Sequence, residues 1–243
     1  MEVARPLNDT GIDWCADGST NYDSGDAVLK RQNCDSVAAD YPGQDGMHGR
    51  DAQGRDGDLD KVGAGAAGFD FTKLDASGND LPASATEWTC VRDNHTDLTW
   101  EVKTDDGGLR DSGHTYTWYQ PDGPNMGDPG VQDDGSCSGS ACDTHAFVQA
   151  VNAEGLCGDD DWRLPTVNEL HSLSHLGQAG PTVETDFFPN TASTEYWSAS
   201  PVAEGSDYAW TSDYAWTVYF GNGRGAFGSK SNNGGVRLVR GGQ

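Results

Sequence analysis

The chain has 243 residues, enough for one large domain or two small ones with a sizeable core. Its 39 Asp and Glu outnumber its 15 Lys and Arg, and the formal net charge is −24. A surface this acidic repels nucleic acid and anionic membranes, so neither is expected as a partner. The 33 Gly, the 10 Pro and a hydrophobic content of only 35% predict a loop-rich fold, in which eight Trp can bury large apolar areas.

The first part of the chain is rich in Asp and Gly and has little periodic pattern. Within it, only residues 68–74 are candidate strand material. We therefore predict a loop-rich N-terminal extension over residues 1–85, packed on a main domain at 86–243, with Pro82 and its small neighbours at the boundary. The longest apolar runs have only a few residues, so direct insertion into a membrane is not expected.

The six cysteines are even in number and lie mostly in loops rich in Gly, Asp and Ser, which is typical of disulfides in exported proteins. Six cysteines allow fifteen pairings. A zinc site is disfavoured, because the chain has no Cys-x-x-Cys and its histidines are scattered. We expect an extracellular or cell-surface protein whose signal or anchor segment lies outside this chain. Local spacing favours the pairs Cys15–Cys34 and Cys137–Cys142, which leaves Cys90–Cys157.

Two helices are predicted in the middle of the main domain. Asp143 can cap a helix over residues 144–154, and Gly155 stands where that helix should end. Thr166 and Glu169 have the spacing of a capping box, which predicts the start of a second helix.

Antiparallel strands surround these helices. Residues 98–102 alternate like a half-buried strand, and three short aromatic or β-branched runs follow near the C-terminus. The order of elements predicts an α+β fold with two helices and a twisted antiparallel sheet. A perfect tandem hexapeptide covers residues 206–211 and 212–217. Because six is an even number, the extra copy does not change which side chains of the next strand point inward and which point outward. The expected core residues of the last strands are Trp197, Trp216, Val218, Phe220, Val236 and Leu238.

The region around the second of these strands is the candidate ligand-binding surface. Thr217 and Tyr219 alternate with the expected core residues and should therefore point outward. Residues 221–235 have almost nothing to bury and should lie beside that strand. In this set Tyr208, Tyr219, Arg224 and Phe227 are the expected anchors, since Tyr and Arg concentrate binding energy. The alternative is that Tyr219 and Phe227 only cover a neighbouring loop. The full predicted set is Asp207, Tyr208, Thr217, Tyr219, Asn222, Arg224, Phe227, Ser229, Ser231, Asn232 and Asn233.

Patterns typical of metal or catalytic sites are incomplete. Asp56, Asp58 and Asp60 alternate as in calcium loops, but the Gly and terminal Glu of an EF-hand are missing. His171 and His175 lie four apart on a predicted helix, without the Glu between them that a zinc protease uses as its base. No Ser occupies a Gly-x-Ser-x-Gly elbow. We therefore predict no metal, no cofactor and no catalytic residue.

Several strings together resemble one family. They are Asp-Trp-Arg-Leu-Pro-Thr-Val-Asn-Glu-Leu at 161–170, Tyr-Trp-Ser-Ala-Ser at 196–200 and Val-Arg-Leu-Val-Arg at 236–240. In this order they resemble the domain family named for the C-terminal domain of a bacterial collagen-like adhesin, over residues 88–242. The resemblance implies a C-type lectin-like fold, which is similar to that of formylglycine-generating enzymes. The oxidation chemistry of those enzymes rests on a late cysteine pair, and no Cys follows Cys157, so we expect the fold without the activity.

The end of the chain also resembles the variable proteins of diversity-generating retroelements. Those elements copy a template RNA with errors at adenines into the 3′ end of a target gene. Errors at the first two bases of Asn codons never produce Lys, Glu, Gln, Met or Trp, and residues 217–235 obey this rule except at Lys230. The resemblance implies a diversified surface that binds a protein or glycan on another cell or particle. The alternatives are a fixed-specificity adhesin of the same fold and, third, an oxidase of the formylglycine-generating type.

Overall fold

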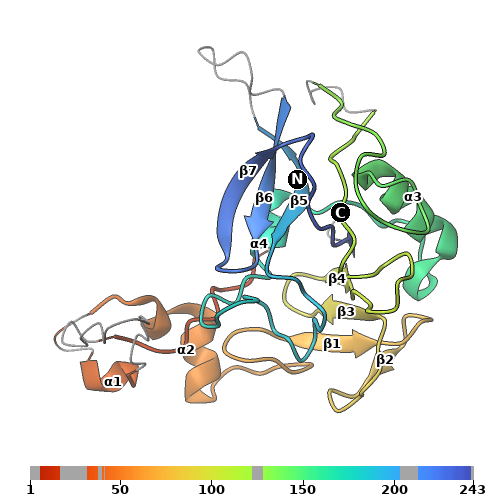
Figure 1. Cartoon of the computed structure of the whole chain (residues 1–243). Coiled ribbons are helices and arrows are strands. Elements are labelled where there is room, and N and C mark those ends of the chain that lie inside the picture. The colour runs from red at the N-terminus through yellow and green to blue at the C-terminus, as the bar shows by residue number, and fades with distance from the viewer. Residues whose placement is uncertain are drawn as a thin grey trace, which may run out of the picture.

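Two antiparallel sheets and four α-helices form the part of the chain that this computed structural model describes (Figure 1). The combination confirms the predicted α+β class. The finer expectation of a C-type lectin-like arrangement stays a prediction. The described residues are 6–16, 32–37, 40, 42–121, 128–202 and 213–241.

The larger sheet pairs strands from the start and the end of the expected main domain with two strands that precede that domain in the sequence. Its strand order is β2-β1-β3-β4-β8, and all its neighbours are antiparallel. Strands β1 and β2 come from the expected N-terminal extension, so one sheet crosses the boundary expected at residues 85 and 86. The strands are β1 (Phe71–Leu74), β2 (Asp80–Leu81), β3 (Cys90–Asp93), β4 (Leu98–Glu101) and β8 (Val239–Gly241).

The smaller sheet has the order β5-β6-β7, with β6 in the middle and β7 at one edge. Its strands are β5 (Glu195–Pro201), β6 (Tyr214–Tyr219) and β7 (Arg224–Ser229). The register of β5 against β6 shifts between Trp197 and Pro201, whereas β6 and β7 pair without interruption. The second copy of the tandem hexapeptide runs into β6, and the first copy lies outside the described residues.

Helices α3 (Thr144–Glu154) and α4 (Val167–His171) are the two that the sequence predicts. The Asp143 side chain accepts a hydrogen bond from the Ala146 N–H, and Gly155 ends α3 at a φ of 66°. The Thr166–Glu169 capping box forms at the start of α4 as expected. Further short elements are α1 (Cys34–Val37), α2 (Gly49–Asp56) and the 3₁₀ turns η1 (Asp45–Met47) and η2 (Leu156–Gly158).

The apolar side chains form two main clusters, one on each side of β3 and β6. One contains Phe71, Trp100, Leu170 and Val218, and it joins the larger sheet to α4. The other contains Trp118, Phe147, Trp162 and Trp197, and it joins α3 to the smaller sheet. Five of the six residues predicted as the core of the last strands are at most 2% exposed, which confirms Trp197, Val218, Phe220, Val236 and Leu238.

Four cations are buried inside this framework, and each lies over an aromatic ring. The distances from the cation to the ring centre are 3.5 Å for Lys73 over Trp88, 4.5 Å for Lys103 over Phe147, 4.4 Å for Lys230 over Trp118 and 4.9 Å for Arg237 over Phe188. Burial lowers the pKa of all four side chains, because it penalises the charged form. The ring faces offset part of that penalty.

The Trp-Arg-Leu-Pro-Thr string fastens α4 to the edge of the larger sheet. Both guanidinium Nη atoms of Arg163 donate to the Glu169 carboxylate, at 2.9 and 2.7 Å, and Nη2 also donates to the Gly241 carbonyl. The Arg163 N–H donates to the Val239 carbonyl. Burial alone raises the pKa of Glu169, but the hydrogen bonds from Arg163 and Thr166 outweigh it and the net pKa is lowered.

This lowered pKa predicts acid sensitivity at α4. The stabilisation from Glu169 is complete above its ordinary pKa of 4.5 and disappears as the pH falls through the lower folded-state pKa. Thermal unfolding should therefore show Glu169→Gln less stable than the wild type at about pH 6, with the difference shrinking toward about pH 3. Glu154→Gln, at an exposed position of α3, is the matched control. A constant difference for Glu169→Gln across this range would contradict the assignment.

All three predicted disulfides are present, and they close loops of very different length. Cys90–Cys157 joins β3 to η2 with 67 residues of separation, Cys15–Cys34 spans 19, and Cys137–Cys142 spans 5. The entropy that a crosslink removes from the unfolded chain grows with loop length.

Loop length predicts the order of the stability losses. Replacing Cys90 and Cys157 together by Ala should lower the free energy of unfolding by about 4 kcal/mol, against about 2 kcal/mol for the Cys137 and Cys142 pair. Urea titration of the two double variants measures both values. An equal loss, or the reverse order, would contradict the prediction.

Candidate ligand-binding surface

Strands β6 and β7 form a hairpin whose turn holds the first predicted loop residues. The Tyr219 carbonyl accepts hydrogen bonds from the N–H groups of Asn222 at 3.3 Å and Gly223 at 2.9 Å. Gly223 has a φ of 73°, and a Cβ at this position would lie 2.2 Å from the Leu176 side chain. Only glycine meets both demands, so the turn and the register of β7 are determined locally.

The predicted inside and outside faces of β6 are wrong at two positions. Thr217 was expected to point outward but is only 1% exposed, opposite Trp197 of β5. Trp216 was expected in the core but is only half-buried. The reason is that β6 borders two clusters: Ala215 and Thr217 face the side of Trp197, while Val218, on the opposite face, enters the cluster around α4. Alternation alone cannot choose a face when both sides of a strand are partly buried.

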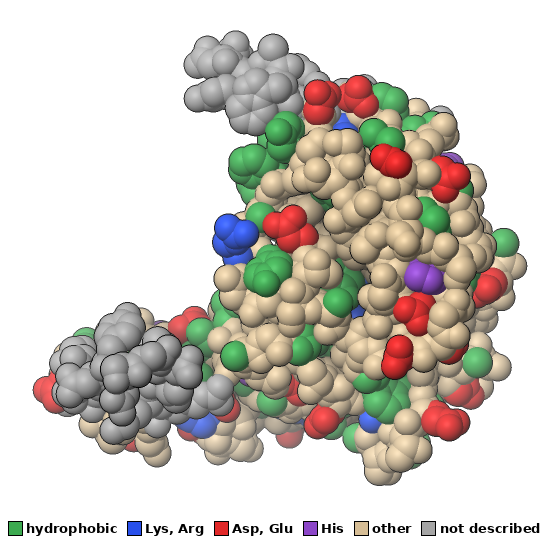
Figure 2. All heavy atoms as spheres, in the orientation of Figure 1, with side chains coloured by type: hydrophobic (Ala, Val, Ile, Leu, Met, Phe, Trp, Pro, Cys, Tyr) green, Lys and Arg blue, Asp and Glu red, His purple; other side chains and the backbone are tan. Residues whose placement is uncertain are grey.

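An aromatic cluster lies on the same face of the hairpin as Val218, toward the ends of β6 and β7 that are far from the turn. It consists of Tyr214, Trp216 and Phe227. The Phe227 ring lies edge-on to Tyr214 at 5.8 Å and to Trp216 at 5.9 Å between ring centres. Phe227 is 53% exposed, which makes it one of the few large apolar side chains on the described surface. Hydrophobic side chains gather at the upper left of Figure 2, where Figure 1 places β6 and β7.

The other predicted site residues divide between the two faces of the hairpin and the loop after it. Tyr219 and Arg224 form a cross-strand pair on the face opposite to the aromatic cluster. Arg224 is exposed and lies 4.0 Å from the Glu195 carboxylate. Asp207 and Tyr208 lie outside the described residues. Ser229 is half-buried, whereas Asn222, Ser231, Asn232 and Asn233 are exposed.

Lys230 belongs to the framework although it stands among exposed loop residues. It is 2% exposed, and its ammonium lies over the Trp118 ring and donates to the Asp128 carbonyl. The Asn232 N–H donates to the Ser229 carbonyl at 2.8 Å and closes the turn around it. The loop is thus anchored at its centre by one buried cation.

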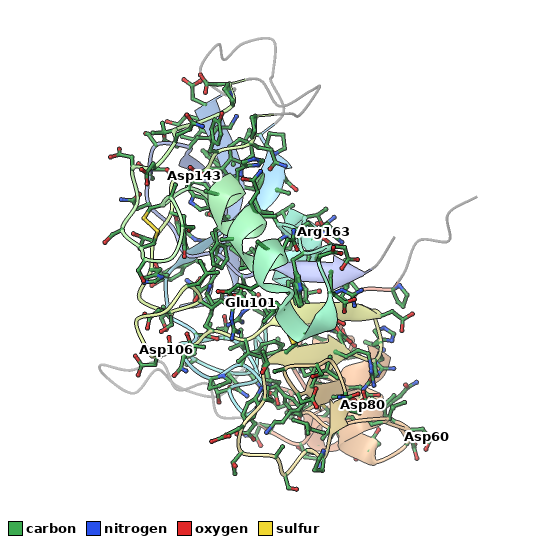
Figure 3. The ribbon with its side chains drawn as sticks, turned by 90° about the vertical axis from the view of Figure 1, so that its right-hand side faces the viewer. Asp60, Asp80, Glu101, Asp106, Asp143 and Arg163 are labelled. Atoms are coloured by element: carbon green, nitrogen blue, oxygen red, sulfur yellow. A yellow bond between two sulfur atoms is a disulfide. The ribbon has the colours of Figure 1, made fainter. Side chains whose placement is uncertain are left out.

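The described surface of the molecule is more acidic than the composition suggests. Among the described Lys and Arg, only Arg224 is exposed; the others are buried or half-buried. Acidic groups point outward in contrast: Figure 3 shows Asp60, Asp80 and Asp106 at the periphery, while Glu101 lies inside. On the surface that the structure describes, Arg224 is thus an exposed cation among many carboxylates.

Sequence reasoning overlooked Tyr214 and Trp216 as surface residues. A signal was present, because both alternate with the small residues Ala215 and Thr217. Small side chains are needed on that inner face, because the Trp197 indole leaves little room there. A Cβ added to Gly228 would lie 3.1 Å from its ring, and one added to Gly234 would lie 2.9 Å from its Nε1.

The candidate metal patterns have ordinary structural roles or remain apart. His175 is 4% exposed, and its Nε2 lies 3.1 Å from the Glu184 carboxylate in the core. Asp56 pairs with Arg55. The part of the chain that the structure describes contains no group of three or more His, Cys, Asp or Glu side chains placed to hold a metal ion.

Comparison with known families identifies the main domain. Residues 89–240 match the family described as the Lcl C-terminal domain. The chain belongs to this family. No curated protein and no solved structure matches it. In this Lcl C-terminal domain the matched span runs from the start of β3 into β8, so it includes the hairpin, and the family is adhesin-like.

The corrected faces of β6 predict unequal costs for two tryptophans. Trp197 is 2% exposed and donates to the Tyr116 carbonyl at 2.8 Å, so Trp197→Ala should cost about 3–5 kcal/mol. Trp216 is half-buried, and Trp216→Ala should cost about 1 kcal/mol. Chemical denaturation of both variants provides the measurement. Equal losses would mean that Trp216 belongs to the framework after all.

Proposed function

We propose that this chain is a ligand-binding display protein of adhesin type that acts outside the cell or at its surface. Its recognition surface is formed by β6, β7 and the loop that follows them. The observation that carries the proposal is the aromatic cluster of Tyr214, Trp216 and Phe227, which is held at the surface by a buried frame.

Apolar side chains that gather at the surface, as exposed Phe227 does with half-buried Tyr214 and Trp216, are characteristic of binding surfaces. Aromatic residues and Arg contribute most of the binding energy in protein interfaces. Each ring has only two rotatable side-chain bonds, so ordering it on binding costs little entropy. The frame below them is firm, because Thr217, Val218 and Phe220 are each at most 1% exposed. Exchange of the outer side chains therefore leaves the fold intact.

We further propose that a diversity-generating retroelement varies this surface. The exposed residues of the segment, including Asn222, Arg224 and Phe227, are all reachable from Asn codons by changes in the first two bases. The one residue that is not reachable, Lys230, is buried and serves the framework. The one exception to the rule therefore belongs to the framework and not to the exposed surface, which supports diversification of that surface.

The second candidate is an adhesin of fixed specificity. One observation favours it: Trp216 is an anchor of the aromatic cluster but cannot arise from an Asn codon, and it lies just before the segment that obeys the rule. The two candidates differ in their genes. Diversification predicts a reverse transcriptase gene and a near-copy of the 3′ end beside this locus. It also predicts that sequence differences between related cells are confined to the exposed positions. An invariant locus without them would leave the fixed adhesin.

Export is part of the proposal. Three disulfides fit an extracellular protein. None of the helices that the structure describes is long and apolar enough to cross a membrane. We propose no catalytic role, because no Cys follows Cys157 to supply an oxidase pair.

Binding to arrays of glycans and of purified extracellular proteins tests the function. For any ligand that binds the wild-type chain, Trp216→Ala and Phe227→Ala should each weaken binding more than tenfold, since truncating an anchor at the centre of an interface removes about 2 kcal/mol or more. Val62→Ala is the control, because Val62 is 80% exposed but lies in the N-terminal part of the chain. Ligands whose affinity is unchanged by both aromatic substitutions would refute the proposed surface.

A further inference from the structure

Strand β7 has an outer edge with unpaired backbone groups. The Lys230 N–H donates to the Asp213 carbonyl, which sets the alternation of the ladder between β6 and β7. By this alternation Ala226 and Gly228 direct their backbone groups to β6, whereas Gly225 and Phe227 direct theirs away from it. In the described part of the chain, neither Gly225 nor Phe227 makes a backbone hydrogen bond outside the sheet ladder.

Apart from Arg224 at its first residue, this edge carries none of the usual protection. Proteins normally shield an edge strand with Pro, a bulge, inward charges or a covering segment. The sequence of β7 is Arg-Gly-Ala-Phe-Gly-Ser, its register against β6 is uninterrupted over six residue pairs, and Gly225 and Phe227 are both exposed. A Cβ at Gly225 would meet no atom within 4 Å. Among the described residues, none pairs with this edge, so it is open to another strand.

The side chains beside the edge restrict what would bind there. A strand added to β7 would place a residue opposite Phe227 and on the same face as Trp216 and Tyr214. Phe227 is 53% exposed, and an exposed aromatic ring attracts a Lys or Arg side chain. The net charge of −24 favours the same kind of segment.

We propose that β7 binds an extended, basic segment of a partner protein by strand addition. Backbone hydrogen bonds to Gly225 and Phe227 supply affinity that is independent of side chains, and the aromatic cluster selects the residue opposite Phe227. A second copy of the chain is a poorer occupant, because each copy carries a net charge of −24 and the copies repel one another. The inference rests on the proposed function and specifies its ligand class.

The probe is a phage-displayed library of linear ten-residue peptides, selected on the full chain. Selected peptides are then titrated against Gly225→Pro and Gly225→Ala. Proline removes the outward N–H and is tolerated on an edge strand, whereas alanine keeps that N–H and fits the open space. We expect basic peptides that lose more than tenfold in affinity on Gly225→Pro and less than twofold on Gly225→Ala, with the same thermal unfolding midpoint for both variants.

Hydrogen–deuterium exchange on the wild-type chain gives a second readout that needs no variant. Binding of a selected peptide should slow exchange of the Gly225 and Phe227 amides at least tenfold. Three outcomes would each overturn strand addition by a partner. The selection could yield no linear peptide, or the selected peptides could bind both Gly225 variants equally and leave the two amides unprotected. The third outcome is a concentration-dependent dimer of the chain that Gly225→Pro abolishes. Peptides that depend on Trp216 but ignore Gly225→Pro would refute strand addition and leave the proposed function intact.

Discussion

The buried carboxylate of Glu101 holds the last residues of the chain against the rest of the molecule. One oxygen accepts the Leu238 N–H and the other accepts the Lys103 ammonium, each at 2.9 Å, and the Glu101 N–H donates back to the Leu238 carbonyl. Arg237 lies next to this pair and is fully buried. The ion pair with Lys103 and the hydrogen bond from Leu238 offset the cost of burying the Glu101 carboxylate, so these contacts help to determine where the terminal segment lies.

The placement of the terminal segment in turn supports the smaller sheet. Arg237 lies over Phe188 and near Tyr196 of β5, and the Trp197 N–H donates to the Gly235 carbonyl. Tyr196 and Trp197 then pair with Val218 and Thr217 of β6. A chain of buried contacts therefore runs from β4 to the hairpin and keeps it rigid. A rigid hairpin can present varied or adaptable side chains without losing its own shape.

The distribution of charge follows from the same framework. Four cations are buried over aromatic rings, and among the described Lys and Arg only Arg224 is exposed. The acidic surface discourages self-association, which matters for a chain with an open β7 edge. It also gives the aromatic cluster and that edge a common preference for a basic segment. The position of the cations thus affects the stability of the core, the self-association of the chain and the kind of segment that it binds.

The sequence by itself determined the local features: the three disulfides, the cap of α3, the capping box of α4 and most of the terminal core. Each depends on residues close in sequence or on a residue type with one stable environment, as Asp143 and Gly155 show at the two ends of α3. Only the tertiary structure decided which face of β6 is buried, because that depends on two clusters built from distant segments. It also placed Lys230 against Trp118 and joined β1 to β3 across the expected boundary. Burial is a property of the assembled layers, and alternation along one strand does not contain it.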